Sequence, residues 1–141
     1  MNANLGILWA GLATGAFAIV FNVHGRHIPA SALGGSLGWA VFLLASQSLG
    51  SQGVAYFAAA VAVALYAEIA SRILQGPAGT YVVCAIISLV PGGGMYYMMA
   101  ESLAGNLPKT LDVGFRTLGT AGAIAAGLAI GSAVARLAKR L

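Results

Sequence analysis

Charged residues are scarce in this chain, and their scarcity decides its class. Only 7% of the 141 residues are Asp, Glu, Lys or Arg, whereas 60% are hydrophobic. Soluble domains carry about 25% charged residues, so a soluble globular fold is excluded. The seven Lys and Arg outnumber the three Asp and Glu, but long apolar runs separate the basic residues, which argues against nucleic-acid binding. We expect an all-α integral membrane protein in contact with the lipid bilayer.

Cysteine and histidine are almost absent as well. The single Cys84 lies in an apolar run and has no second cysteine with which to form an intrachain disulfide. His24 and His27 stand three residues apart without a further ligand nearby, so no metal site is predicted. The sequence shows no set of nucleophile, base and orienting group and no phosphate-binding loop. We therefore predict neither an enzyme with catalytic residues nor a cofactor.

Five apolar runs of about 20 residues, the length that crosses about 30 Å of hydrocarbon, predict transmembrane helices. They cover residues 5–23, 31–49, 54–73, 80–103 and 113–137. The connections between them are short and contain turn residues such as Pro29, Pro77 and Pro108. Residues 1–141 are thus expected to form a single five-helix transmembrane domain.

Basic residues near the helix ends predict the orientation. With five crossings, one side of the membrane collects five of them, Arg26, Arg72, Arg136, Lys139 and Arg140. The other side has two, Lys109 and Arg116, which are offset by Glu101 and Asp112. The positive-inside rule then places the C-terminus in the cytoplasm and the N-terminus outside. The expected location is the cytoplasmic (inner) membrane of the cell.

The predicted fourth helix contains the segment SLVPGGGMYY at residues 88–97. Pro91 lies eleven residues after Thr80, or about 16 Å along a helix, so we predict a Pro-Gly-Gly-Gly break near the bilayer midplane. Proline leaves carbonyls near Ile87 and Ser88 without helical partners. Irregular backbone at this depth is tolerated where it is buried in protein or lines a cavity. A re-entrant hairpin would export the basic C-terminus, so a single broken crossing fits better.

Two half-helices that meet at such a break offer opposite partial charges to one small volume. The N–H groups near Gly94 favour an anion such as a carboxylate, and the carbonyls at residues 88–90 favour a cation or an ammonium. An amino-acid zwitterion suits this site, and a carboxylic acid with a coupling proton also fits. The alternative is a structural kink satisfied by neighbouring helices and a water. The predicted substrate-binding residues are Ser88, Pro91, Gly92, Gly93, Gly94, Tyr96, Tyr97 and Asn22.

Four charged residues are candidates for coupling or gating. Glu68 and Arg72 lie four residues apart on one helix face. They form either an ion pair near the interface or a site in which Glu68 accepts a proton or acts as a gate. Glu101 and Arg116 flank the outer connection and are either an external gate or two solvated helix ends.

Small residues recur every four positions in the last predicted helix. They are Gly119, Ala123, Gly127, Gly131 and Ala135. Further pairs of this kind, Gly11 with Gly15 and Gly34 with Gly38, lie in the first two helices. Such stripes let helices approach closely in lipid, so we expect a tightly packed bundle.

The sequence resembles the threonine/serine exporter family, in particular its short membrane subunit, in two stretches. These are GAFAIVFNVHGRHIPASALGGSLGW at residues 15–39 and EIASRILQGPAGTYVVCAIISLVPGGGMYYMM at residues 68–99. The resemblance implies half of an ion-coupled secondary transporter that exports threonine or serine together with a larger five-helix membrane subunit. Some two-subunit relatives are linked instead to succinate or other dicarboxylates. The family-typical positions are Asn22, Glu68, Arg72, Pro91, Gly92 and Tyr97.

One position departs from the family pattern, and several functions stay open. The family commonly has a second proline three residues before the Pro-Gly, where this chain has Ser88, so a gentler break is expected. Two five-helix units joined end to end have opposite orientations, as in the inverted repeats of transporters, which favours a distinct partner subunit. The alternatives are a homo-oligomer, a non-transporting membrane scaffold and a passive channel.

Overall fold

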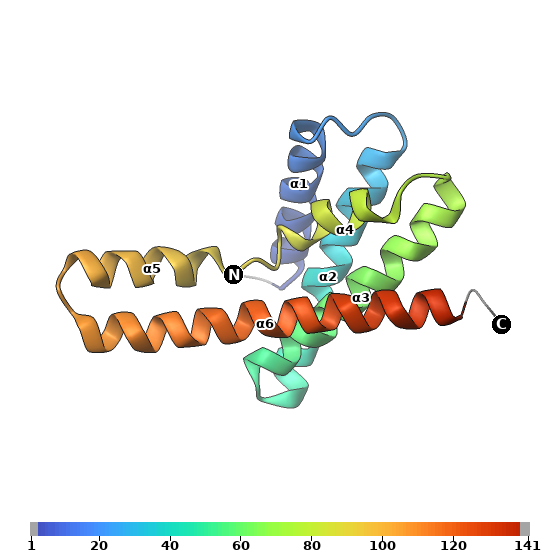
Figure 1. The fold of residues 1–141 in the computed structure, drawn as a ribbon. Helices are drawn as coiled ribbons and strands as arrows, with labels where there is room; N and C mark the ends of the chain where they lie inside the picture. The colour runs from blue at the N-terminus through green and yellow to red at the C-terminus, as the bar shows by residue number, and fades with distance from the viewer. Residues whose placement is uncertain (1–2, 139–141) are drawn as a thin grey trace.

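The computed structural model describes residues 3–138 and folds them into α-helices (Figure 1). The helices are α1 (Ala3–Val20), α2 (His27–Leu49), α3 (Gln52–Leu74), α4 (Ala78–Ile86), α5 (Gly92–Leu103) and α6 (Leu107–Leu137). The all-α prediction is confirmed for this part of the chain. Lys139 and Arg140, which contribute to the predicted charge bias, lie outside the described residues.

Residues in the left-handed region end several helices. Asn22 has a φ of 61° after α1, and the N–H groups of Asn22 and Val23 bond to the carbonyls of Ile19 and Ala18, each at 2.9 Å. This is the Schellman pattern, which satisfies carbonyls that a helix end leaves unpaired. Gly50, Gln75 and Gly105 have positive φ after α2, α3 and α5.

Small residues set the spacing between the helices of the main bundle. A Cβ atom on Gly38 of α2 would lie 2.7 Å from Val63 Cγ2 of α3, and one on Gly127 of α6 would lie 2.6 Å from the carbonyl oxygen of Phe57. Gly131 faces Ala64 in the same way. These contacts are closer than a side chain would allow. The predicted close packing is confirmed here, and the buried cluster beside it consists of Ala59, Ala60, Val63, Ala85, Leu89 and Ile124.

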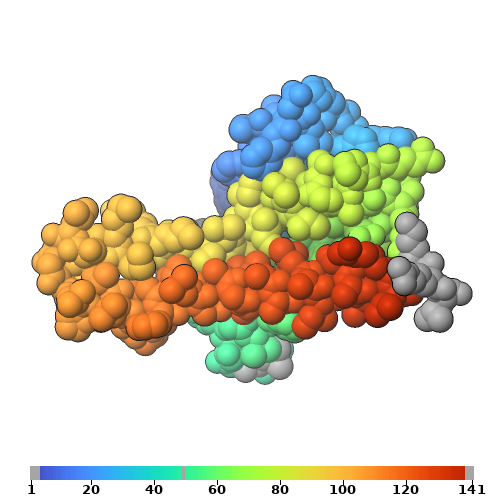
Figure 2. Space-filling view, in the orientation of Figure 1, coloured from blue at the N-terminus to red at the C-terminus, as the bar shows by residue number. Residues whose placement is uncertain are grey.

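Helix α5 and the first half of α6 form a hairpin that projects from the other helices (Figures 1 and 2). We call this hairpin the arm. Among the described residues, α6 is the only helix that α5 contacts, and α5 has no buried residue. Gly94 packs against Thr117, and Gly114 against Met98, so the two helices run antiparallel. The arm exposes large apolar side chains, including Met95, Met99, Leu103, Leu107, Leu111, Phe115 and Leu118.

Three helices of the described chain are long and apolar enough to cross a membrane. They are His27–Ser48, Gln52–Leu74 and Leu107–Leu137. An apolar stretch in α1, Asn4–Val20, is shorter. Helices α4 and α5 have 9 and 12 residues, so neither alone reaches the length of about 20 residues that crosses the hydrocarbon. Together they occupy the segment in which we predicted the fourth crossing.

Candidate functional site

The chain passes from α4 to α5 through residues 87–91, where regular helical hydrogen bonding stops. The N–H groups of Leu89 and Val90 both bond to the carbonyl of Ile86, at 2.8 and 3.1 Å. Pro91 has no N–H to offer the carbonyl of Ile87, and the N–H of Gly92 bonds to Val90 at 2.8 Å instead of reaching Ser88. The carbonyl oxygens of residues 87 and 88 therefore lack their helical partners.

A cavity of about 420 Å³ opens at this point, and we call it the break cavity. Gly92 and Gly93 have no atom within 4 Å of their Cβ positions, so both face open space, whereas Gly94 packs directly against the hydroxyl of Thr117. Five of the predicted substrate-binding residues line the cavity: Ser88, Pro91, Gly92, Gly93 and Gly94. Other helices supply Trp39, Gln52, Tyr56, Val113, Arg116, Thr117 and Thr120, and Val90 completes the lining.

The polar groups of the break cavity favour a ligand with a negative charge at one end. Helix α5 begins without a side-chain N-cap, so the N–H groups of Gly93 and Gly94 in its first turn have no helical partner. Arg116 is the only charged residue in the described lining. The Ser88 hydroxyl donates to the carbonyl of Ala85 at 2.9 Å. A carboxylate fits near the start of α5, and an ammonium fits against the unpaired carbonyls at the end of α4.

The other predicted substrate-binding residues lie elsewhere. Tyr96 and Tyr97 are 69% and 61% exposed on the arm and do not line the break cavity. Their rings pack edge to face, with centroids 5.5 Å apart. Asn22 lines a second cavity at the opposite end of α4. The structure thus does not bring these three residues to the break.

The second cavity, which we call the turn cavity, has a volume of about 450 Å³. It lies between the turn that joins α1 to α2 and the beginning of α4. Cys84 forms part of its wall and is buried, as expected for a packing residue. The remaining lining residues are Phe21, Asn22, Val23, His24, His27, Pro77, Gly79, Thr80, Tyr81 and Val83.

The expected ion pair between Glu68 and Arg72 is absent from the described part of the chain. Arg72 is exposed, and its Nη2 instead donates to the carbonyl of Ala135 at 3.1 Å. That carbonyl lies in the last turn of α6, where helical carbonyls lack partners and attract a cation. The ion-pair prediction is therefore wrong, and the half-buried Glu68 keeps its proposed proton-accepting role as a prediction.

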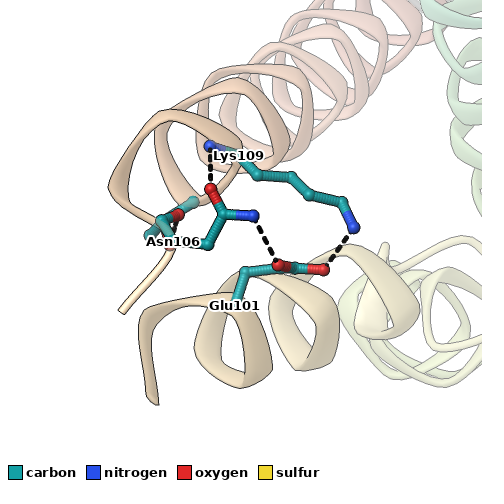
Figure 3. Close-up of polar contacts among 4 residues, drawn as sticks. Glu101, Asn106 and Lys109 are labelled. Atoms are coloured by element: carbon teal, nitrogen blue, oxygen red, sulfur yellow. Dashed lines mark hydrogen bonds and ion pairs between the residues drawn. The ribbon is translucent and has the colours of Figure 1, made fainter. Parts of the chain in front are cut away.

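Glu101 and Arg116 do not meet in the structure. Glu101 pairs with Lys109 across the turn of the arm, with 2.5 Å between Oε1 and Nζ (Figure 3). Asn106 caps α6 by accepting from the N–H of Lys109, and its Nδ2 donates to Glu101 at 3.3 Å. Arg116 pairs with Asp112 one turn earlier, at 3.1 Å. Each charge of the expected external gate has a partner within the arm.

Several lining residues were not identified from the sequence. Thr117 and Thr120 carry hydroxyls on an apolar helix beside Arg116. This pattern in the sequence could have identified them as residues that line a polar cavity. No local pattern places Gln52 opposite Pro91, because only the packing of α3 against α6 brings the two segments together.

Comparison with known proteins identifies a family. The family model described as Threonine/Serine exporter, ThrE, matches residues 6–134. No curated protein and no solved structure matches the chain.

Proposed function

Since the chain belongs to the threonine/serine exporter family, we propose that it is one subunit of an ion-coupled secondary transporter that exports threonine or serine across the inner membrane. The break cavity carries this proposal. The first turn of α5, with its free N–H groups, and Ser88, with its unpaired carbonyl, line the same cavity. The carboxylate of an amino-acid zwitterion suits the N–H groups, and its ammonium suits the carbonyl. Discontinuous helices bind substrates in this way in secondary transporters.

The proposed subunit is a single domain with five crossings, in which α4 and α5 together form one broken crossing. Helices α3 and α6 run in the same direction where they cross, because Gly127 faces Phe57 and Gly131, one turn later, faces Ala64. Two parallel crossings require that the chain between them cross the membrane an odd number of times. The segment α4–α5 supplies that crossing, which supports a broken helix over a re-entrant hairpin. The basic residues near the helix ends support a cytoplasmic C-terminus.

The proposed partner is a larger five-helix membrane subunit of the same family. In the described residues α5 contacts only α6 and has no buried residue, so the arm offers an apolar surface to another protein as well as to lipid. A homo-oligomer is the alternative. Chemical cross-linking from a cysteine placed at Met99, which is 65% exposed, distinguishes the two by the mass of the product.

A dicarboxylate such as succinate is the second candidate substrate. Arg116 lines the break cavity, and no Asp or Glu is found in the described lining. The Arg116 guanidinium pairs with Asp112 through Nε, and its remaining N–H groups together with those of α5 suit a second carboxylate better than an ammonium. This observation makes the substrate class the first quantity to measure.

Flux measurements in liposomes that contain the chain and its candidate partner test the proposal. We expect gradient-dependent export of labelled threonine that serine inhibits and Gly93→Leu abolishes. The added side chain enters open space in the cavity and blocks the substrate. Gly119→Leu is the matched control, because Gly119 also faces open space but lies outside the cavity lining.

Each other outcome has a distinct meaning. Undiminished flux in an assembled Gly93→Leu complex contradicts the site, and export of succinate in place of threonine supports the second substrate. Flux that ignores the ion gradient indicates a passive channel. Absence of flux for both substrates in an assembled complex supports a scaffold.

A further inference from the structure

We propose that the turn cavity is a second binding site, which takes a carboxylate group. Its volume of about 450 Å³ falls within the range of about 300–1,000 Å³ typical of small-molecule sites. This inference rests on the proposed function, because the transported substrate is what suggests a carboxylate ligand. It adds a site at the opposite end of α4 from the break cavity.

Asn22 offers its side-chain amide to the cavity, while its backbone N–H is already hydrogen-bonded within the protein. Its N–H bonds to the carbonyl of Ile19 at 2.9 Å as part of the turn that ends α1. Its side-chain amide takes part in none of the side-chain hydrogen bonds described for the chain, and it lines the cavity. Asn is one of the few residues that tolerate the left-handed backbone found here. The amide is therefore free to donate to a ligand.

His27 and Tyr81 form a fixed wall of the turn cavity. The imidazole Nδ1 lies 2.6 Å from the phenolic oxygen, and Tyr81 is only 1% exposed. Gly76 packs against both, because a Cβ there would lie 2.9 Å from the Tyr81 oxygen and 3.0 Å from His27 Cε1. We assign His27 and Tyr81 as positioning residues that hold the start of α2 against α4 and keep the cavity open.

The groups around the turn cavity select a negative charge. The described lining contains two histidines and no Asp or Glu. Arg26 lies outside this lining, and its Nη2 donates to the carbonyl of Leu74 at 3.2 Å. Helix α4 starts at the cavity wall without a side-chain cap, and Thr80 in its first turn adds a hydroxyl. Free helical N–H groups stabilise a carboxylate, and the amide of Asn22 and the hydroxyl of Thr80 can donate to it.

One polar contact near each cavity joins α2 to α4 or to the residues that follow it. At one end the imidazole of His27 in α2 meets the hydroxyl of Tyr81 in α4. At the other end the Ser88 hydroxyl, whose proton is shared with the carbonyl of Ala85, lies 3.4 Å from the carbonyl oxygen of Gly35. Helix α2 therefore reaches both cavities, through His27 at one and Trp39 at the other, while the chain that leaves α4 enters the break cavity at Ser88. In the proposed topology the turn cavity faces the cytoplasm, so it receives the carboxylate before the break cavity does.

A cysteine-protection experiment on the purified full chain tests binding without transport. The Cys84→Ala chain carrying Gly79→Cys has one thiol, at an exposed position of the cavity wall where a Cβ meets no atom within 4 Å. We expect L-threonine or succinate to slow its reaction with a maleimide by about tenfold at a concentration ten times the dissociation constant. L-Threoninol, which lacks the carboxylate, is expected not to protect.

Matched variants assign the effect to the site. Gly53→Cys in the same background is the control, because its Cβ also meets no atom within 4 Å but it does not line the turn cavity. Asn22→Gly removes the amide while keeping the left-handed backbone, and we expect roughly tenfold weaker protection from the loss of one charge-assisted hydrogen bond. Thr80→Val should weaken it by about fivefold. Calorimetric titration of the unmodified chain with both carboxylates covers the case in which the cysteine variant fails to fold.

The arms of the experiment separate the outcomes. Protection by threonine alone, by succinate alone or by both supports a carboxylate site and identifies the source of the carboxylate. Equal protection by threoninol, equal protection of the control thiol, or no protection together with no binding heat overturns the inference. Protection of the thiol without flux in liposomes supports the turn-cavity site and contradicts the proposed transport function. Flux without protection supports the transport function and contradicts the turn-cavity site.

Discussion

Both halves of α6 contain glycines, but the glycines of the two halves lie in different surroundings. In the C-terminal half, Gly127 and Gly131 lie against α3 so closely that Cβ atoms would come within 2.6 and 2.7 Å of it. In the N-terminal half, Gly119 and Gly122 have no atom within 4 Å of their Cβ positions. Gly127 and Gly131 thus form a helix–helix contact, whereas Gly119 and Gly122 face open space. The fold depends on the close contact of the C-terminal half of α6 with α3. The proposed substrate site lies beside the N-terminal half.

The largest effect is expected from Gly127→Leu. The new side chain must displace the backbone of Phe57, and overpacking of this kind costs about 1–3 kcal/mol or more. Thermal unfolding of the purified protein in detergent measures the loss. Gly119→Leu, on the same helix, should leave the melting temperature nearly unchanged. Equal losses in the two variants would show that both halves pack alike.

Gly94→Val should produce a smaller and local effect. Its side chain would meet Thr117 and push α5 from α6, at a cost of about 1–3 kcal/mol confined to the arm. Hydrogen exchange should become faster over α5 and the first half of α6, while α3 stays protected. Uniformly faster exchange would mean that the arm and the bundle unfold together, which contradicts the separation of the two halves.

Arg72→Gln should reduce stability only slightly. The variant loses the hydrogen bond to Ala135, and solvent around the exposed Arg72 limits the loss to less than about 1 kcal/mol. A double-mutant cycle with Glu68→Gln should give a coupling energy near zero, because the two side chains do not pair. A coupling energy of several tenths of a kcal/mol would show that Glu68 and Arg72 do form an ion pair, contrary to the structure.

The smallest change is expected from Glu101→Gln at the tip of the arm. The ion pair with Lys109 is partly exposed, with 60% of the lysine side chain accessible, and pairs of this kind contribute about 0.2–1 kcal/mol. The difference from the unmodified chain should disappear at high salt, where exposed charges are screened. Persistence at high salt would indicate that the pair is held away from solvent.

The sequence predicts the helices well because apolar runs, prolines and glycines mark where they begin and end. The five predicted runs correspond to α1, α2, α3, the pair α4–α5, and α6. Which face each residue occupies is harder to predict, because that depends on the contacts between helices. Tyr96 and Tyr97 follow Pro91 closely in sequence, yet α5 directs them to the surface of the arm.

The two cavities show the same limit. Asn22 and Tyr81 are distant in sequence, and only the packing of the α1–α2 turn against α4 brings them together. For Arg116 and Glu101 the sequence left open an external gate or two solvated helix ends. Helical spacing already offered Arg116 a partner in Asp112 four residues away, the usual distance for a pair on one helix face. Contacts within a helix can thus be predicted from spacing, whereas the members of a cavity require the tertiary structure.

The paired charges at the tip of the arm also bear on how the protein enters the membrane. If the C-terminus is cytoplasmic, the ribosome makes this tip on the inner side and the bilayer must let it through. An ionised side chain costs about 2.5–3.5 kcal/mol at the centre of an inserting helix. Lys109 with Glu101 and Arg116 with Asp112 give two neutral pairs, and Asn106 already closes the turn between the helices. The hairpin can therefore form first and be translocated as one unit without net charge.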